Sequence, residues 1–144
     1  MPSAYSPQTR FPHWKRPVFD EHGMTKWGWM CQHSEKLKLG RYVDIGAFTY
    51  INALYGVEME ELVQVGSHAS IYSVSTIDGK KGKVHLKRNA RIGSHAVIMP
   101  GVTVGENSVV GAFSFVNGDV PDNVVAYGIP ARVVKAGRAP TKKG

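Results

Sequence analysis

Aliphatic residues recur every six positions along most of this chain, and this period constrains the fold more than any other feature. The longest unbroken series comprises Leu86, Ile92, Ile98, Val104, Val110 and Val116. An earlier series with the same spacing comprises Leu39, Ile45, Ile51 and Val57. A period of six matches neither the 3.6-residue turn of an α-helix nor the two-residue alternation of a strand. Each unit must therefore be a very short strand followed by a corner.

The period slips at two places. Val57 and Val65 are eight residues apart, after which Val65, Ile71 and Ile77 resume the series, and nine residues separate Ile77 from Leu86. The second slip contains residues 78–83, whose Asp, Gly and Lys content is typical of a turn. We expect both slips to leave the coil as bulges or loops.

Three such units close one coil of a narrow triangular prism, and stacked coils pair as parallel strands around an apolar column. The aliphatic residue of each unit points inward. Small residues four positions later fit near the corners, where volume is short: Ala90, Ala96, Ser108 and Ser114. Glycine after the aliphatic position permits backbone conformations that a β-carbon resists. The pattern predicts an all-β protein built as a parallel β-helix.

The segment from Ile92 to Lys135 resembles the C-terminal signature of the hexapeptide-repeat acyltransferases, above all in its final Gly-Ile-Pro-Ala-Arg-Val-Val-Lys. The resemblance covers about residues 39–135. It implies that the β-helix is left-handed, whereas general rules on crossover connections favour the right hand. We therefore expect a left-handed β-helix over residues 39–135, an irregular arm or cap over 1–38, and a basic flexible tail over 136–144.

The first 38 residues have no six-residue phase and are rich in Pro, His and Trp. Terminal repeats of a solenoid need a cap, so we expect this arm to close one end of the prism. Its aromatic residues include Trp14, Trp27 and Trp29.

Composition limits the classes of protein that the chain can belong to. Its 144 residues and 42% apolar content fit one folded domain. No apolar run is long enough to span a bilayer, and the first ten residues lack the features of a signal peptide, so we expect a cytoplasmic protein. The single cysteine, Cys31, excludes an internal disulfide framework and is typical of a small packed residue.

The net charge of +7 is concentrated toward the C-terminal end, where no acidic residue follows Asp122. Basic residues interleaved with exposed aromatics along a groove or recognition helix would indicate nucleic-acid binding, and no such motif is present. A phosphorylated small molecule explains the charge equally well.

The resemblance implies a homotrimer that binds acetyl-CoA in the groove between neighbouring prisms and transfers the acetyl group to a small acceptor. The family places basic residues near the coenzyme where this chain has Arg132 and Lys135, and close backbone approach to the pantetheine arm at Gly93, Gly111 and Ala112. The acceptor is expected to be a sugar, free or nucleotide-linked, used in bacterial surface polysaccharide. No nucleophilic Ser or Cys motif is evident, so we expect direct attack in a ternary complex, without a metal.

An attacking hydroxyl or amine must lose a proton, and histidine is the usual general base. Many related sugar O-acetyltransferases carry a catalytic histidine just before the loop, where this chain has Ser75-Thr76-Ile77-Asp78. We choose His68 as base, although it occupies the same repeat position as His95. Alternatively, His33 of the arm acts, or an amine attacks without a strong base, which favours N-acetylation. Trp27, Trp29 and His33 are the candidate acceptor contacts.

Two other functions remain open. A γ-type carbonic anhydrase has a similar prism and holds Zn²⁺ with three histidines, for which His68, His85 and His95 are the candidates. Their spacing does not reproduce the closely spaced final pair of that family. The second alternative is a non-catalytic trimeric scaffold or sugar-binding module. It is considered because the histidine that related enzymes carry before the loop is missing here.

Overall fold

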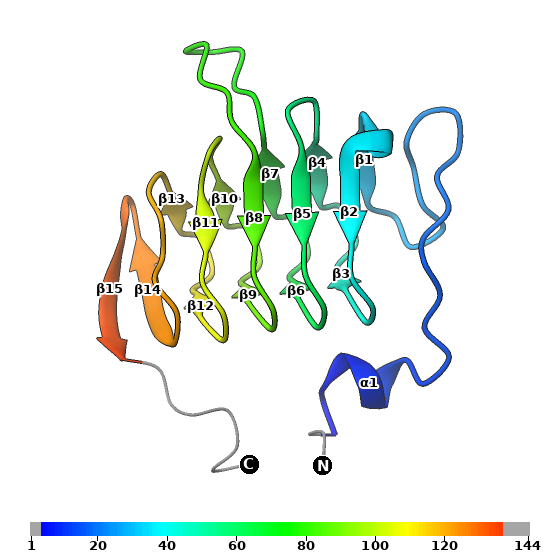
Figure 1. Ribbon diagram of the computed structural model, residues 1–144, viewed down its shortest axis with the longest axis horizontal. Coiled ribbons are helices and arrows are strands. Elements are labelled where there is room, and N and C mark those ends of the chain that lie inside the picture. Colours follow the sequence, from blue (N-terminus) through cyan, green and yellow to red (C-terminus); the bar gives the residue numbers. More distant parts are fainter. Residues whose placement is uncertain (1–3, 137–144) are drawn as a thin grey trace.

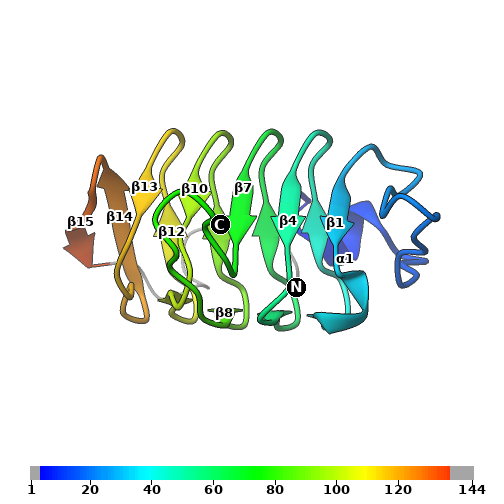
Figure 2. The ribbon, with the colours of Figure 1, turned by 90° about the horizontal axis from the view of Figure 1, so that it is seen from above.

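The computed structural model describes residues 4–136. From Met30 onward they form the left-handed parallel β-helix that the sequence predicts. Successive strands are added to three sheets in turn, here named A, B and C. The coils lie side by side along the long axis of the molecule (Figure 1), and the strands of sheet A form one row in the perpendicular view (Figure 2).

From β1 to β13, each sheet collects every third strand of the chain, and β14 and β15 then both join sheet C. Sheet A contains β1 (Met30–Gln32), β4 (Tyr50–Asn52), β7 (Ser70–Tyr72), β10 (Val97–Ile98) and β13 (Phe115–Val116). Sheet B contains β2 (Leu37–Leu39), β5 (Val57–Met59), β8 (Val84–Leu86) and β11 (Thr103–Val104). Sheet C contains β3 (Asp44–Ile45), β6 (Gln64–Val65), β9 (Arg91–Ile92), β12 (Val109–Val110), β14 (Val124–Gly128) and β15 (Ala131–Ala136).

The inward residues of each sheet pair directly with one another. On sheet A, for example, Ile51 pairs with Ile71 of the next coil. Both are fully buried, and burial of such a side chain contributes about 1.5–3 kcal/mol. The predicted small corner residues are also buried: Ala90, Ala96, Ser108 and Ser114. A single coil exposes both of its rims, so this core exists only because the coils stack.

Both slips of the period leave the prism at the corner between sheets A and B. The two extra residues of the first lie between Ile51 and Met59, in the turn that precedes β5. The second is the loop of residues 73–83, which stands out from the coil between β7 and β8 (Figure 1). The prediction that Ile77 points inward is wrong, because Ile77 lies on this loop and is 94% exposed.

The N-terminal arm packs against the first coil of the prism. Trp14 donates from Nε1 to the carbonyl oxygen of Val43 at 2.9 Å, and the Phe19 ring packs edge-on against Trp29 with centroids 5.5 Å apart. Regular coil structure begins at Met30, within the range expected for the arm. The arm region also contains the short helices α1 (Pro7–Arg10) and η1 (Ser34–Lys36). Within residues 4–136, no helix is long and apolar enough to cross a membrane.

The other end of the prism is closed by an antiparallel hairpin. β14 continues sheet C beside β12, and β15 turns back along β14. Of the tail expected over residues 136–144, Ala136 is the last residue of β15, and the rest lies outside the described residues.

Candidate functional site

Four rings form an exposed stack along the corner between sheets C and A, here called the aromatic corner: Phe48, His68, His95 and Phe113. Neighbouring ring centroids are 4.9, 4.7 and 4.7 Å apart. The outer members Phe48 and Phe113 are 69% and 64% exposed. The rings therefore stack on one another outside the core.

The backbone conformation of the four ring residues positions this stack. All four residues have φ between 61° and 66°, in the left-handed region that non-glycine residues seldom adopt. The N–H of each donates to the coil before it, as in the 3.0 Å bond from His68 to the carbonyl oxygen of Ala47. The N–H of Phe48 donates in the same way to the carbonyl oxygen of Gly28 in the N-terminal arm.

Neighbouring coils approach closely beside this corner. A β-carbon on Gly93 would lie 2.5 Å from the nitrogen of Ala112 and 2.8 Å from its Cα, closer than any real side chain approaches backbone. Glycine at 93 is therefore needed for the coil spacing, and its φ is not in the left-handed region. The left-handed residue is His95, two positions later.

The residues that precede the rings leave backbone donors open. Between residues 4 and 136, the N–H groups of Ala47, Ser67, Ser94 and Ala112 make no hydrogen bond within the protein. Their carbonyl groups are used, since Ala47, Ser67 and Ser94 accept from the next coil. The aromatic corner thus presents a row of unpaired donors beside a row of rings.

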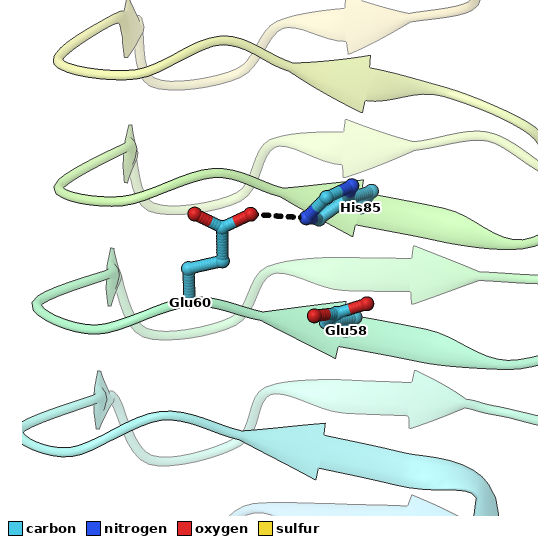
Figure 3. Close-up of side chains that lie close together, drawn as sticks. All are labelled: Glu58, Glu60 and His85. Atoms are coloured by element: carbon cyan, nitrogen blue, oxygen red, sulfur yellow. Dashed lines mark hydrogen bonds and ion pairs between the residues drawn. The ribbon is translucent and has the colours of Figure 1, made fainter.

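Sheet B carries a second candidate group, of charged and hydrogen-bonded side chains, on its outer face. His85 Nε2 lies 2.5 Å from Glu60 Oε2 (Figure 3). Glu60 Oε1 accepts from the Arg88 N–H at 3.1 Å. Glu58 accepts from Lys83 Nζ at 2.8 Å, and this hydrogen bond lowers the pKa of the Glu58 carboxyl group. Ligand atoms of Glu58, Glu60 and His85 all lie within 4.8 Å of one another.

A shallow hollow of about 420 Å³ lies beside this group. Its charged lining consists of Lys36, Lys38, Lys83 and Glu58, and Tyr55 supplies an aromatic wall. A larger cavity of about 810 Å³ lies between the arm and the first coil, with Trp14, Trp27 and Trp29 in its walls. It is mainly apolar and holds no charge pair beyond the Arg10–Asp44 contact at its edge.

Comparison with known proteins decides the family. Residues 83–118 match the model of the family described as bacterial transferase hexapeptide (six repeats). Galactoside O-acetyltransferase of Escherichia coli (strain K12) is 37% identical over 111 residues, which are 67% of this chain and 55% of that protein. The chain belongs to the hexapeptide-repeat transferase family.

Other relatives of this hexapeptide-repeat protein include serine acetyltransferase of Bacillus subtilis (strain 168), 38% identical over 95 residues, which are 62% of this chain and 44% of that protein. A maltose O-acetyltransferase structure from Clostridium difficile 630 superimposes with a TM-score of 0.72 at 26% identity, covering 78% of this chain and 65% of that one. A hexapeptide-repeat acetyltransferase of Vibrio cholerae O1 biovar eltor, complexed with acetyl coenzyme A, gives 0.73 at 25% identity, covering 77% and 66%. The chain spans about half the length of the galactoside O-acetyltransferases that it matches.

The predicted coenzyme residues of the hexapeptide-repeat protein lie between the turn that follows β9 and the final hairpin. Gly93 and Ala112 lie at the aromatic corner, and Gly111 packs against the side chain of Tyr127. Arg132 and Lys135 are exposed on β15, whose partner strand contains Tyr127.

The predicted acceptor residues do not come together. Trp29 is 2% exposed and belongs to the core, so its ring has no face open to a sugar. Trp27 lies in the wall of the larger cavity beside the arm, whereas His33 follows β1 at the corner between sheets A and B. His33 Nδ1 lies 3.9 Å from Glu35 Oε1.

The three histidines considered for zinc are also divided. His68 and His95 stack at the aromatic corner, while His85 lies on sheet B, on the opposite side of the prism. In the sequence His85 was named only as a zinc candidate, and its partner Glu60 was missed because it is 25 residues away. The register of β5 with β8, where Glu58 pairs with His85, is the signal that reveals the pair.

Proposed function

We propose that this hexapeptide-repeat protein is an acetyltransferase that moves the acetyl group of acetyl-CoA to a hydroxyl or amine of a small acceptor. Its relatives are named acetyltransferases for different acceptors, a galactoside in one case and serine in another. A structural neighbour was solved with acetyl-CoA. What the relatives share is the acetyl donor, and the acceptor is what varies.

The open backbone donors of the aromatic corner carry this proposal. The pantetheine arm of coenzyme A contains two amide groups, whose carbonyl oxygens accept hydrogen bonds from N–H groups. Ser94 and Ala112 offer unpaired N–H groups on successive coils, and the small side chains there leave the backbone accessible. The flat rings of His95 and Phe113 supply an apolar wall for the rest of the arm.

The phosphates of coenzyme A need cations, and we assign them to Arg132 and Lys135 on β15. Both side chains are exposed, and Arg132 makes only a 3.0 Å bond from Nη1 to the carbonyl oxygen of Ala131. Phosphate recognition by guanidinium groups is favourable because several N–H groups donate at once.

We infer direct transfer in a ternary complex, without a covalent acetyl-enzyme. The only thiol, on Cys31, is 1% exposed, and burial raises its pKa to about 12, so it does not supply a thiolate. His68 as general base stays a prediction. Its ring faces are covered by Phe48 and His95, which supports a role in shaping the corner.

The remaining expectations belong to the same proposal. A homotrimer would cover the exposed rings of Phe48 and Phe113 in the groove between prisms. A sugar acceptor agrees with the galactoside relative, whereas a role in surface polysaccharide and a cytoplasmic setting rest on the sequence resemblance alone. No step of the proposed transfer calls for a metal.

Acetyl-CoA affinity of two matched variants tests the coenzyme site. Ala112→Leu places a bulky side chain over the proposed pantetheine site, and we expect acetyl-CoA to bind at least about tenfold more weakly by calorimetry, a loss of about 1.4 kcal/mol. Ala47→Leu makes the same change at the corner's other end and should leave the affinity unchanged. Equal affinities for both variants and the unmodified protein would remove the aromatic corner as the coenzyme site.

Turnover is tested by following free CoA with a thiol reagent, using galactosides, serine and nucleotide-linked neutral and amino sugars as acceptors. Release of CoA with one acceptor class would identify the reaction. Tight binding of acetyl-CoA without turnover on the whole panel would favour the scaffold reading over the enzyme.

A further inference from the structure

Sheet B carries a histidine–carboxylate pair that the coenzyme site does not use. We propose that His85 is the general base of the transfer, that Glu60 positions it, and that the acceptor carries a phosphate group held by the neighbouring lysines. This inference rests on the proposed function and names its base and its class of acceptor.

The contacts of Glu60 define the state of the His85 ring. The carboxylate accepts from Nε2, and its second oxygen is held by the Arg88 N–H. Because a carboxylate only accepts hydrogen bonds, the neutral ring carries its proton on Nε2, and Nδ1 presents a lone pair. The carboxylate also stabilises the imidazolium that forms when Nδ1 takes a proton.

The other histidines of the described residues lack this arrangement. His22 and Glu21 are 3.7 Å apart, and both side chains are largely exposed. His33 and Glu35 are 3.9 Å apart on the surface. The side chains of His85 and Glu60 are 27% and 33% exposed, so water competes less for their bond while one ring edge stays accessible.

The proposed step balances as an acyl transfer. The acceptor oxygen or nitrogen attacks the thioester carbonyl while its proton passes to Nδ1 of His85. The tetrahedral intermediate collapses, the carbon–sulfur bond breaks, and the CoA thiolate takes the proton from the imidazolium. The products are the acetylated acceptor and free CoA.

The hollow beside the pair indicates the class of acceptor. Lys36, Lys38 and Lys83 meet there with one carboxylate, that of Glu58, so its net charge is positive. Glu58 belongs to both the hollow and the His85 cluster, which places the cations next to the base. Tyr55 offers a ring for a base or sugar to stack on, and a phosphate-bearing sugar satisfies the lysines and the aromatic wall together.

The same three ligand atoms can in principle hold a divalent cation. However, Lys83 already neutralises Glu58, and Glu60 already pairs with His85. We therefore assign the cluster to proton transfer. Unchanged turnover after dialysis against a chelator is expected, and loss of turnover that Zn²⁺ or Mg²⁺ restores would overturn this assignment.

The base is tested with His85→Ala, Glu60→Ala and the surface control His22→Ala. We expect kcat to fall about a hundredfold in His85→Ala and at least about tenfold in Glu60→Ala, with acetyl-CoA affinity unchanged and His22→Ala fully active. Full activity of His85→Ala, or its loss in His68→Ala alone, would overturn the assignment. If the unmodified protein does not bind acetyl-CoA, the proposed function itself is wrong.

Two further measurements do not depend on finding the acceptor. Nitrogen-15 spectra of the imidazoles should show His85 protonated at Nε2 and unprotonated at Nδ1. This preference should be lost in Glu60→Ala, and a proton on Nδ1 would refute the positioning role.

Pyrophosphate should shift the amide resonances of Lys38 and Lys83, and the shifts should vanish in a Lys38→Ala, Lys83→Ala double variant. Absence of any shift in the unmodified protein would overturn the phosphate-bearing acceptor.

Sheet B faces away from the aromatic corner of its own prism, so the two halves of the site must meet between copies. Mixing His85→Ala with Ala112→Leu, at an acetyl-CoA concentration too low to saturate Ala112→Leu, should therefore restore part of the activity, because some interfaces then combine one intact corner with one intact His85. Failure of the mixture, with exchange of subunits verified, would contradict the placement of His85 opposite a neighbouring corner.

Discussion

His68 and His95 stack face to face on successive coils, with ring centroids 4.7 Å apart and planes inclined by only 3°. Neither ring is buried in the prism, so the stack is a surface feature held by the backbone. It is one of several side-chain columns that follow from the repetition of the coil.

Replacing His68 with Asn should destabilise the protein by about 0.5–1.5 kcal/mol, because the ring contacts with Phe48 and His95 are lost. Asn tolerates the left-handed backbone that this position requires, so the change isolates the ring. Urea unfolding gives the free energy, and His22→Asn on the arm serves as control. Identical midpoints for the two variants would show that the stack adds no stability.

Gly93→Ala should cost about 2–3 kcal/mol, because the new methyl group meets the backbone of Ala112, which cannot rotate away. Gly118→Ala is the matched control, since a β-carbon there has nothing within 4 Å. We expect that variant to remain within about 0.5 kcal/mol of the unmodified protein by thermal unfolding. A stable Gly93→Ala protein would mean that the coils separate more easily than the spacing implies.

Asn107 links two other asparagines at the corner between sheets B and C, accepting from Asn89 at 2.7 Å and donating to Asn123 at 3.3 Å. Its φ of 58° is also left-handed. Asn107→Ala loses both bonds and strains the backbone, for an expected loss of about 2 kcal/mol. Asn107→Gly keeps the backbone relaxed and should lose less, as measured by urea unfolding; equal losses would assign the whole effect to the side-chain bonds.

Arg10→Gln should destabilise the protein more at pH 7 than near pH 4. Burial raises the pKa of the Asp44 carboxyl group, and the 2.7 Å ion pair with Arg10 partly opposes that rise. A raised pKa means that the folded state binds the proton more tightly, so the contribution of Asp44 to stability falls as pH rises through the folded-state pKa. Removing Arg10 leaves the charged carboxylate without its partner at pH 7 and matters little once Asp44 is protonated.

The measurement is the urea midpoint at both pH values. Arg41→Gln is the control, because Arg41 lies over the Tyr42 ring and its loss should not depend on pH in this range. An Arg10→Gln effect that is equal at pH 4 and pH 7 would contradict the coupling to Asp44.

Cys31 should not react with thiol reagents in the folded protein. Burial, and secondarily the charge of Glu35, raises its pKa to about 12, and its side chain is 1% exposed. One thiol per chain should appear only on denaturation, which also makes the CoA release assay free of background. Rapid labelling at neutral pH would indicate local opening of the first coil.

The sequence alone was sufficient for the repeating part of the structure. Inward residues such as Leu86 and Ile92 were predicted because a hydrophobic period survives only where each copy faces the same core. The inward orientation predicted for Ile77 was wrong, because periodicity does not distinguish an aliphatic residue in a loop from one in the coil. The left-handed backbone at His68 and His95 was not predicted, because those residue types rarely adopt it.

The residues of the candidate site also differ in whether the sequence alone could predict them. The predicted coenzyme residues, from Gly93 to Lys135, could be named from the sequence because one contiguous segment carries them. His85 and Glu60 are brought together by the register of β5 with β8 across the 73–83 loop, and the burial of Trp29 depends on how the arm folds over the first coil. The sequence by itself thus determined the coil and its inward face, which follow from a local period, whereas tertiary structure decided which outward side chains meet, because that depends on the lengths and paths of the insertions between strands.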